Sequence, residues 1–225
     1  DNEQCAHPEE DRRRFETAVQ STVDQVSSLI SQIDDLSPQD QDVLKTHKLL
    51  LQDQTFLDKV GARIGEGVTA EYGLKQVVEE YLKIFRNVED PYLRERGKDI
   101  EDVGKSILRN LLGIPFQSTK VFEHSTIVVA TDLSPAELVV LRQKNFKGLI
   151  LSRGGMTSHA VILAQSFEIP TVIRAREAVE RITEGESLIV DGSSGLVFRS
   201  PPEEIQEEYQ RLASDHQRVD REMQS

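Results

Sequence analysis

Residues 148–173 read Gly-Leu-Ile-Leu-Ser-Arg-Gly-Gly-Met-Thr-Ser-His-Ala-Val-Ile-Leu-Ala-Gln-Ser-Phe-Glu-Ile-Pro-Thr-Val-Ile, with the signals of two strands joined through a turn and a helix. The apolar run at 149–151 predicts a buried strand, and the β-branched residues of 171–173 predict a second one. Between them, Gly154 and Gly155 break the apolar pattern and permit a tight backbone turn. This order predicts a strand–loop–helix–strand unit of an α/β domain.

The helix of this unit begins beside a histidine. Thr157 and Ser158 are both favourable N-cap residues, and the apolar spacing over 160–167 is typical of a short helix. Pro170 is expected to end the helix, because proline disfavours the helical conformation in the residue before it. We therefore expect His159 in the first helical turn, directly after a Gly-Gly loop.

A histidine at that position suits phosphate chemistry. The first N–H groups of a helix have no partner within the helix and favour an anion. The same positive end disfavours an imidazolium, so we expect His159 to be neutral, with a ring nitrogen ready to attack phosphorus. Spacing alone equally allows an ordinary histidine in the capping region of a strand–helix connection, and both interpretations stay open at this point.

Residues 154–164, Gly-Gly-Met-Thr-Ser-His-Ala-Val-Ile-Leu-Ala, resemble the active-site signature of the phosphohistidine swivelling domains. That group includes Enzyme I of the phosphoenolpyruvate–sugar phosphotransferase system, phosphoenolpyruvate synthase and pyruvate phosphate dikinase. In these enzymes the signature histidine accepts and passes on a phosphoryl group, so the resemblance implies that His159 is the carrier. The residues expected to support the phosphate are Gly154, Gly155, Thr157 and Ser158.

The composition limits the classes of protein that fit the chain. With 27 basic and 39 acidic residues in 225, the net charge is −12, which argues against general binding of nucleic acids or anionic membranes and permits a basic protein partner. No apolar run approaches a membrane span and no signal-peptide pattern is present, so we expect a cytoplasmic protein. Cys5 is the only cysteine and the five histidines lack metal-ligand spacing, so the sequence predicts no metal site.

Residues 9–113 are predicted to be almost entirely helical. Apolar residues at helical spacing over 15–33 predict a first helix of about seven turns. A second helix begins at Pro38 and a fourth at Pro91, each with an N-cap residue before the proline. A third begins at Thr69, which is itself a favourable N-cap.

Glycines divide this helical region. Gly61, Gly65 and Gly67 follow the second pattern and predict a break between short helices, and Gly113 ends the last helix. Four amphipathic helices with short connections predict an antiparallel bundle or a pair of hairpins.

Residues 114–200 mix strands with short helices. A strand is predicted at 126–130, a helix from Pro135 to near residue 144, and a hairpin at 187–198. Residues 201–225 predict a polar C-terminal linker helix. The fold class is therefore α+β or α/β, with a four-helix subdomain at 9–113 followed by a small α/β domain.

The helical half narrows the resemblance to Enzyme I. Residues 92–104 and 111–113 look like the fourth helix of its phosphocarrier-binding subdomain, and 47–53 are similar to its second helix. Residues 131–137 match the stretch leading into the active-site strand. Dikinase and synthase domains lack such a helical insertion, so Enzyme I is the better match.

The resemblance implies a two-step transfer. Phosphoenolpyruvate phosphorylates Nε2 of His159, and the phosphoryl group then passes to a histidine of a small phosphocarrier protein docked on the helical subdomain. The residues implied in docking are His47, Leu49, Leu50, Phe56, Leu93 and Arg96. Core packing is the alternative for the leucines and Phe56, and an intrahelical pair with Asp99 is the alternative for Arg96.

Some positions depart from a typical Enzyme I. Arginine is usual where Met156 and Gln165 stand, and residues 38–40 replace the acidic residues expected ahead of the second helix. The threonine often found beside the active-site histidine corresponds to Leu138, so a hydrogen bond to the imidazole is expected to be missing. These departures are typical of a divergent branch, such as the nitrogen-regulatory phosphotransferase system, whose carrier is a different small protein.

The family also has segments that this sequence lacks. It begins with a short strand bearing Ser-Pro-Gly, and a barrel domain that binds phosphoenolpyruvate and Mg²⁺ follows the matching region. The resemblance implies an N-terminal fragment without a cofactor of its own, which exchanges phosphoryl groups with its carrier but takes none from phosphoenolpyruvate unaided. Family dimers form through the barrel domain, so we expect a monomer here and a homodimer at full length.

Two other classes stay open. The first is a swivelling domain of the dikinase or synthase type, whose histidine is served by a nucleotide site. The second is a non-catalytic helical adaptor that binds a partner through the bundle, with His159 vestigial.

Overall fold

The structure is a computed structural model that describes residues 4–32, 38–114, 122, 124–142, 144–156 and 158–223. The side chains of residues 32, 39, 40, 91–95 and 216–223 lie outside the description. The chain divides into two compact units, which are described separately. The helical unit comprises Asp1–Val121, Ser134–Lys144 and Thr157–Leu163, and the sheet unit comprises Phe122–Leu133, Asn145–Met156 and Ala164–Ser225.

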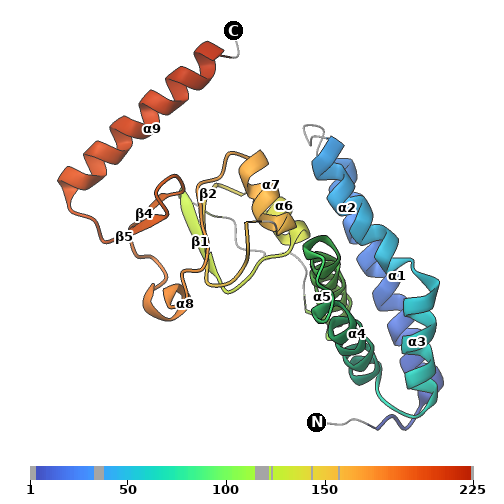
Figure 1. Cartoon of the computed structure of the whole chain (residues 1–225). Coiled ribbons are helices and arrows are strands. Elements are labelled where there is room, and N and C mark those ends of the chain that lie inside the picture. Colours follow the sequence, from blue (N-terminus) through green and yellow to red (C-terminus); the bar gives the residue numbers. More distant parts are fainter. Residues whose placement is uncertain are drawn as a thin grey trace. The chain divides into compact units, whose positions relative to one another are not determined.

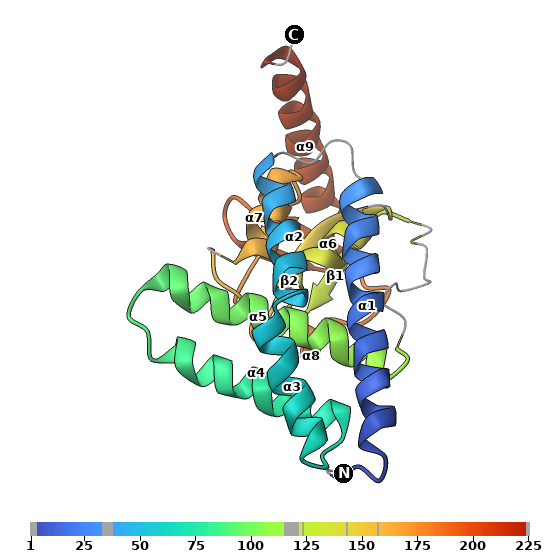
Figure 2. The same cartoon turned by 90° about the vertical axis from the view of Figure 1, so that its right-hand side faces the viewer.

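Among the described residues, five long helices build most of the helical unit (Figure 1). They are α1 (Pro8–Gln32), α2 (Pro38–Leu51), α3 (Gln54–Gly65), α4 (Ala70–Arg86) and α5 (Pro91–Leu111). Helices α2 and α3 follow one another along α1, and α4 packs on α5 (Figure 2). The predicted helix starts at Pro38 and Pro91 are confirmed, and Thr69 caps α4 by accepting a hydrogen bond from the Tyr72 N–H.

The break predicted around Gly61, Gly65 and Gly67 lies at Gly65 and Gly67, where α3 ends, and not at Gly61. Helix α3 continues through Gly61 as far as Gly65, because Phe56, Val60 and Ile64 recur every four residues and are all buried. A second break lies earlier, after α2, where the Asp53 carboxylate accepts a hydrogen bond from the Phe56 N–H at 2.8 Å and starts α3. The second predicted helix, which runs through Leu51, is confirmed as α2, and α3 is a further helix that the four-helix prediction did not include.

The core of the helical unit lies between α1, α3, α4 and α5. The α1 residues in it recur every three or four positions, as the sequence predicts, and are Phe15, Ala18, Val19, Val23 and Val26. They pack with Val60 of α3, Val77 of α4 and Ile107 of α5. A polar tie joins α1 to α5 within this core, because Asn110 Nδ2 donates to Thr22 Oγ1 at 2.7 Å.

The helical unit also contains α6 (Pro135–Arg142) and the first residues of α7 (His159–Ser166). Ser134 and Glu137 form a capping box at the start of α6, in which each residue bonds the backbone N–H of the other. Arg109 of α5 makes an ion pair with Glu137, which links α6 to the long helices.

The sheet unit holds a parallel sheet and a hairpin. Strands β1 (Thr126–Ala130), β2 (Phe146–Leu151) and β3 (Thr171–Val172) lie in that order, and β4 (Leu188–Asp191) pairs antiparallel with β5 (Leu196–Arg199). The predicted strands and hairpin are confirmed, as is the fold class. The sequence did not predict α8 (Ala178–Arg181), and α9 (Glu203–Met223) matches the predicted C-terminal helix.

Helix α7 ends before Pro170. Its last residue is Ser166, and Glu168 adopts a left-handed conformation with φ 55°. The N–H groups of Glu168 and Ile169 then bond the carbonyls of Gln165 and Ala164, closing the helix end in a Schellman motif. Among the described helices, none combines the length and the hydropathy that a bilayer-spanning segment needs.

Candidate active site around His159

His159 is the first residue of α7, as the sequence predicts. Ser158 precedes it and caps the helix: its Oγ accepts from the Val161 N–H at 3.4 Å, and its carbonyl accepts from Val161 and Ile162. The predicted N-cap role of Ser158 is thus seen directly, whereas Thr157 lies outside the described residues.

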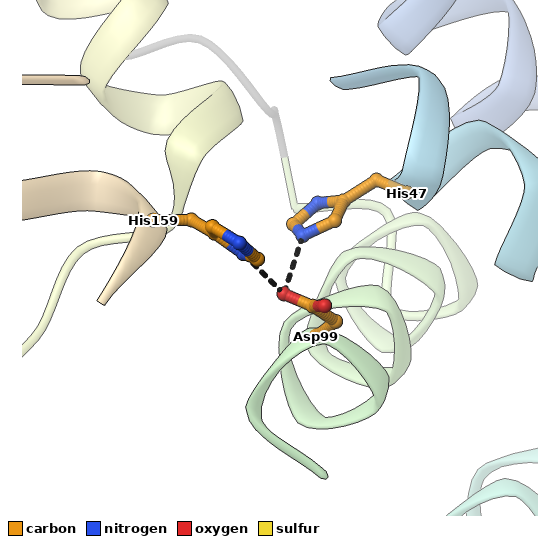
Figure 3. A group of neighbouring side chains, drawn as sticks. All are labelled: His47, Asp99 and His159. Atoms are coloured by element: carbon orange, nitrogen blue, oxygen red, sulfur yellow. Dashed lines mark hydrogen bonds and ion pairs between the residues drawn. The ribbon is translucent and has the colours of Figure 1, made fainter. Parts of the chain in front are cut away.

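Two side chains from other helices of the same unit converge on this histidine (Figure 3). Asp99 of α5 lies with its Oδ1 2.8 Å from Nδ1 of His159. His47 of α2 turns its Nε2 to the same oxygen, at 3.4 Å. Asp99 and His47 are only 1% and 4% exposed, whereas the His159 side chain is 27% exposed. The Asp99 carboxylate is therefore hydrogen-bonded to two imidazoles, and the more exposed of them, His159, belongs to the signature.

Asp99 is ionised over the whole neutral range. Burial by itself raises the pKa of this carboxyl, but hydrogen bonds with His159 and then with His47 outweigh it and lower the pKa from 3.8 to about 2. Its second oxygen, Oδ2, is buried and accepts no hydrogen bond from the described residues. The Arg96 guanidinium lies 3.9 Å from Oδ2.

This contact decides which nitrogen of neutral His159 keeps a lone pair. A carboxylate can only accept, so in neutral His159 the bond to Asp99 places the proton on Nδ1. A neutral imidazole carries one N–H and one lone pair, and the lone pair is then on Nε2. The geometry therefore prepares Nε2 as a nucleophile.

The expected loss of a hydrogen bond to the imidazole is wrong. Leu138 is fully buried and offers no acceptor, but Asp99 takes that role from a different helix. The sequence predicts Asp99 only as an intrahelical partner of Arg96. A signal was present nonetheless, because Asp99 is an acid within the buried stripe that contains Ile100, Val103 and Ile107.

The residues expected to dock a carrier have different surroundings. Leu49 is 69% exposed, Arg96 is partly exposed, and Leu50 packs partly buried against the core. Phe56 is a core residue, and His47 is buried against Asp99. The Leu93 side chain lies outside the described residues.

The glycines of the signature lie in the loop between β2 and α7. Gly154 has φ 117°, a conformation that residues with a Cβ rarely adopt, which explains the glycine there. Gly155 follows it, and Met156 is 62% exposed. The role of this loop in phosphate binding stays a prediction.

The structure brings together a metal-binding donor set that sequence spacing did not suggest. One donor atom each of His47, Asp99 and His159 lies within 4.8 Å of the others. The three residues are therefore the group of described side chains around His159 that can hold a metal ion.

Two family models match this chain. Residues 122–195 match the mobile domain of PEP-utilising enzymes, and residues 1–96 match the N-terminal domain of PEP-utilising enzymes. The phosphoenolpyruvate-protein phosphotransferase of Listeria innocua is 31% identical over 209 residues, which is 92% of this chain and 36% of that protein. The Bacillus subtilis protein of the same name is 32% identical over 199 residues, 88% of this chain and 35% of that protein.

Two solved structures share the fold. A solution structure of Enzyme I superposes with a TM-score of 0.75 at 27% identity, covering 96% of this chain and 89% of that one. The N-terminal domain of Enzyme 1 - Nitrogen gives 0.62 at 26% identity, covering 94% and 87%. The chain spans little more than a third of the length of the curated phosphotransferases it matches.

Proposed function

Since this chain belongs to the phosphoenolpyruvate-utilising enzymes, with N-terminal and mobile domains of the Enzyme I type, we propose that His159 carries a phosphoryl group from phosphoenolpyruvate to a histidine of a small phosphocarrier protein. The observation that carries this proposal is the 2.8 Å contact between His159 Nδ1 and Asp99, which leaves the nucleophilic lone pair on Nε2. The relatives, which are phosphotransferases, do not favour the dikinase-type alternative.

Each half of the transfer uses the same pair of residues. Nε2 attacks phosphorus, an N–P bond forms, and the bond from phosphorus to the donor oxygen or nitrogen breaks. The phosphorylated ring keeps its proton on Nδ1, where the Asp99 carboxylate accepts it and stabilises positive charge on the ring. A positively charged ring is the better leaving group, so Asp99 supports the onward step as well.

In this proposal the carrier docks on the helical unit beside His159. Leu49 supplies exposed apolar surface, and Arg96 supplies a cation near Asp99. His47, Leu50 and Phe56 support that surface from beneath, and Leu93 is kept as a further contact. Gly154, Gly155, Thr157 and Ser158 are proposed to bind the phosphate.

The remaining functions are assigned to sequence beyond the matched region. Binding of phosphoenolpyruvate and Mg²⁺, and dimerisation, would belong to the part of the relatives that this chain does not span, and this chain alone is proposed to be a monomer. We also propose that the protein lies in the cytoplasm, in keeping with its single cysteine.

The test is phosphoryl exchange measured by intact mass spectrometry. The chain is incubated with a phosphorylated carrier, of the sugar type in one series and of the nitrogen type in another. We expect an acid-labile gain of one phosphate in the wild type and in His7→Ala, whose histidine is exposed, and no gain in His159→Ala. Asp99→Asn should exchange more slowly by about a hundredfold, since the amide can also stabilise the wrong tautomer.

The two carriers decide the branch, because the preferred one should exchange faster. No gain with either carrier, in a chain whose circular dichroism is native, would rule out the proposed function. Phosphorylation of His159→Ala would assign the phosphoryl group to another residue.

A further inference from the structure

The cluster of His47, Asp99 and His159 has the composition of a transition-metal site. Two imidazole nitrogens and one carboxylate oxygen form a donor set that Zn²⁺ and Co²⁺ accept, with a fourth position for water. Tetrahedral zinc, with bonds of about 2.0 Å, separates its ligand atoms by about 3.3 Å. His47 Nε2 and Asp99 Oδ1 are already 3.4 Å apart, and the 2.8 Å between His159 Nδ1 and Asp99 Oδ1 has to widen slightly.

The burial of the cluster also fits a metal ion. His47 and Asp99 lie on two long helices, α2 and α5, and are almost inaccessible to water. The Asp99 carboxylate has an oxygen, Oδ2, to which the described residues donate no hydrogen bond. A bound cation stabilises a buried carboxylate oxygen that accepts no hydrogen bond. His159 is the most exposed of the three and provides the route of entry.

We propose that His47, Asp99 and His159 bind a divalent transition-metal ion of the zinc class, and that the ion and the phosphoryl group exclude each other at His159. The first half stands on the cluster alone, and the second half rests on the proposed function. The metal takes the lone pair of Nδ1, which requires the proton to lie on Nε2. Protonated Nε2 has no lone pair, so the metal-bound chain cannot be phosphorylated there. In the phosphorylated chain Nδ1 holds the proton and is no longer a ligand.

Arg96 distinguishes the two uses of the site. Its guanidinium lies 3.9 Å from Asp99 Oδ2 and competes with a metal ion for the same carboxylate. Replacing it by an uncharged side chain of similar length, in Arg96→Met, should tighten metal binding while slowing phosphoryl exchange. A change that only loosened the local structure would weaken both.

The test uses Co²⁺ and Zn²⁺ without any phosphoryl donor. All proteins carry Cys5→Ser and His7→Gln, because Cys5 and His7 are close in the chain and are a second source of metal ligands. Binding is followed by the visible absorption of Co²⁺ and by calorimetry with Zn²⁺ near pH 7.5. We expect one ion per chain with tetrahedral Co²⁺ absorption, and an affinity lowered about a hundredfold in His47→Gln, Asp99→Asn and His159→Gln.

The matched controls keep the test decisive. His124→Gln removes a histidine outside the cluster and should bind as the parent does. His47 and Asp99 are buried and their variants can lose structure, so His159→Gln, whose side chain is partly exposed, is the variant on which the result depends. Equal affinity in the parent and in His159→Gln would overturn the inference, as would octahedral Co²⁺ absorption unchanged by all three variants.

Competition is then measured with a phosphorylated carrier. Saturating Zn²⁺ should abolish the phosphate gain of the parent, and a chelator should restore it. The phosphorylated chain should in turn bind Co²⁺ more weakly, because two ligands that exclude each other weaken each other's binding equally. If Zn²⁺ binds but exchange proceeds unchanged, mutual exclusion is wrong. If the chain binds Zn²⁺ and never exchanges phosphate, the metal site stands and the proposed phosphoryl transfer fails.

Discussion

Asp99 is the residue on which the site depends. A carboxylate buried at 1% exposure loses its hydration, and among the described side chains the two imidazoles and the more distant Arg96 guanidinium balance this loss. Removing a partner from such a group costs more than the contact itself is worth, because a charge stays behind without compensation. The same residue orients His159, so its structural and chemical effects have to be separated by experiment.

The pH dependence of the free energy of unfolding separates the structural effect of Asp99 from its chemical effect. Burial raises the pKa of Asp99, but the bonds with His159 and His47 prevail and lower it from 3.8 to about 2. Because the pKa is lowered in the folded chain, ionised Asp99 contributes about 2 kcal/mol to the free energy of unfolding. This contribution is complete above the pKa of the unfolded chain, near pH 4, and disappears as the pH falls through about 2. We expect the wild type to exceed Asp99→Asn in free energy of unfolding by this amount at pH 5, and by little at pH 2.

Urea unfolding at a series of pH values measures this difference. Asp58→Asn is the control, because Asp58 is exposed and should show no such change. A difference between wild type and Asp99→Asn that stays constant from pH 5 to pH 2 would contradict the assigned pKa.

At the level of elements, the position of α5 depends on its close approach to α4. A Cβ placed on Gly104 of α5 would lie 2.6 Å from Cγ2 of Val78 on α4, and Val78 is too stiff to move aside easily. Gly104→Ala should therefore lower the free energy of unfolding by about 1–3 kcal/mol. Adding Val78→Ala should recover part of the loss, since the two changes share one contact.

Gly61→Ala, in the same unit, is expected to change the free energy of unfolding in the opposite direction. Gly61 lies inside α3, and no atom comes within 4 Å of the Cβ that alanine would add. This change should raise the free energy of unfolding by about 0.5–1 kcal/mol, from helix propensity alone. Thermal and urea unfolding of both variants check the pair, and equal effects at the two glycines would contradict the close approach of α4 and α5.

At the scale of the whole molecule, the net charge of −12 bears on how the proposed carrier would find the chain. Association with a basic partner is steered by this charge and is screened by salt. Raising NaCl from about 0.05 to 0.5 M should slow phosphoryl exchange at low carrier concentration by about tenfold, with a much smaller change in the free energy of unfolding. Stopped exchange reactions followed by mass spectrometry measure the rate. A rate independent of salt would mean that contacts such as Leu49, and not charge, govern the encounter.

Local signals in the chain predict most elements. Periodicity gives the buried face of α1, prolines and caps give the starts of α2 and α5, and the Gly-Gly loop with Ser158 places His159 at the start of α7. These features are predictable because hydrogen bonds and side-chain spacing within a few residues control them. The same locality led to the error at Gly61, where burial of Phe56, Val60 and Ile64 outweighs the low helix propensity of glycine.

The surroundings of His159 are a different matter. His47 and Asp99 are separated by 52 residues, and Asp99 and His159 by 60, and no local rule relates them. Sequence could place His159 on a helix and Asp99 on another, but the packing of α2, α5 and α7 within one unit brings their side chains to a single oxygen atom. The histidine proposed to carry the phosphoryl group can therefore be predicted from the sequence, whereas the charge that orients it arises only when distant helices pack together.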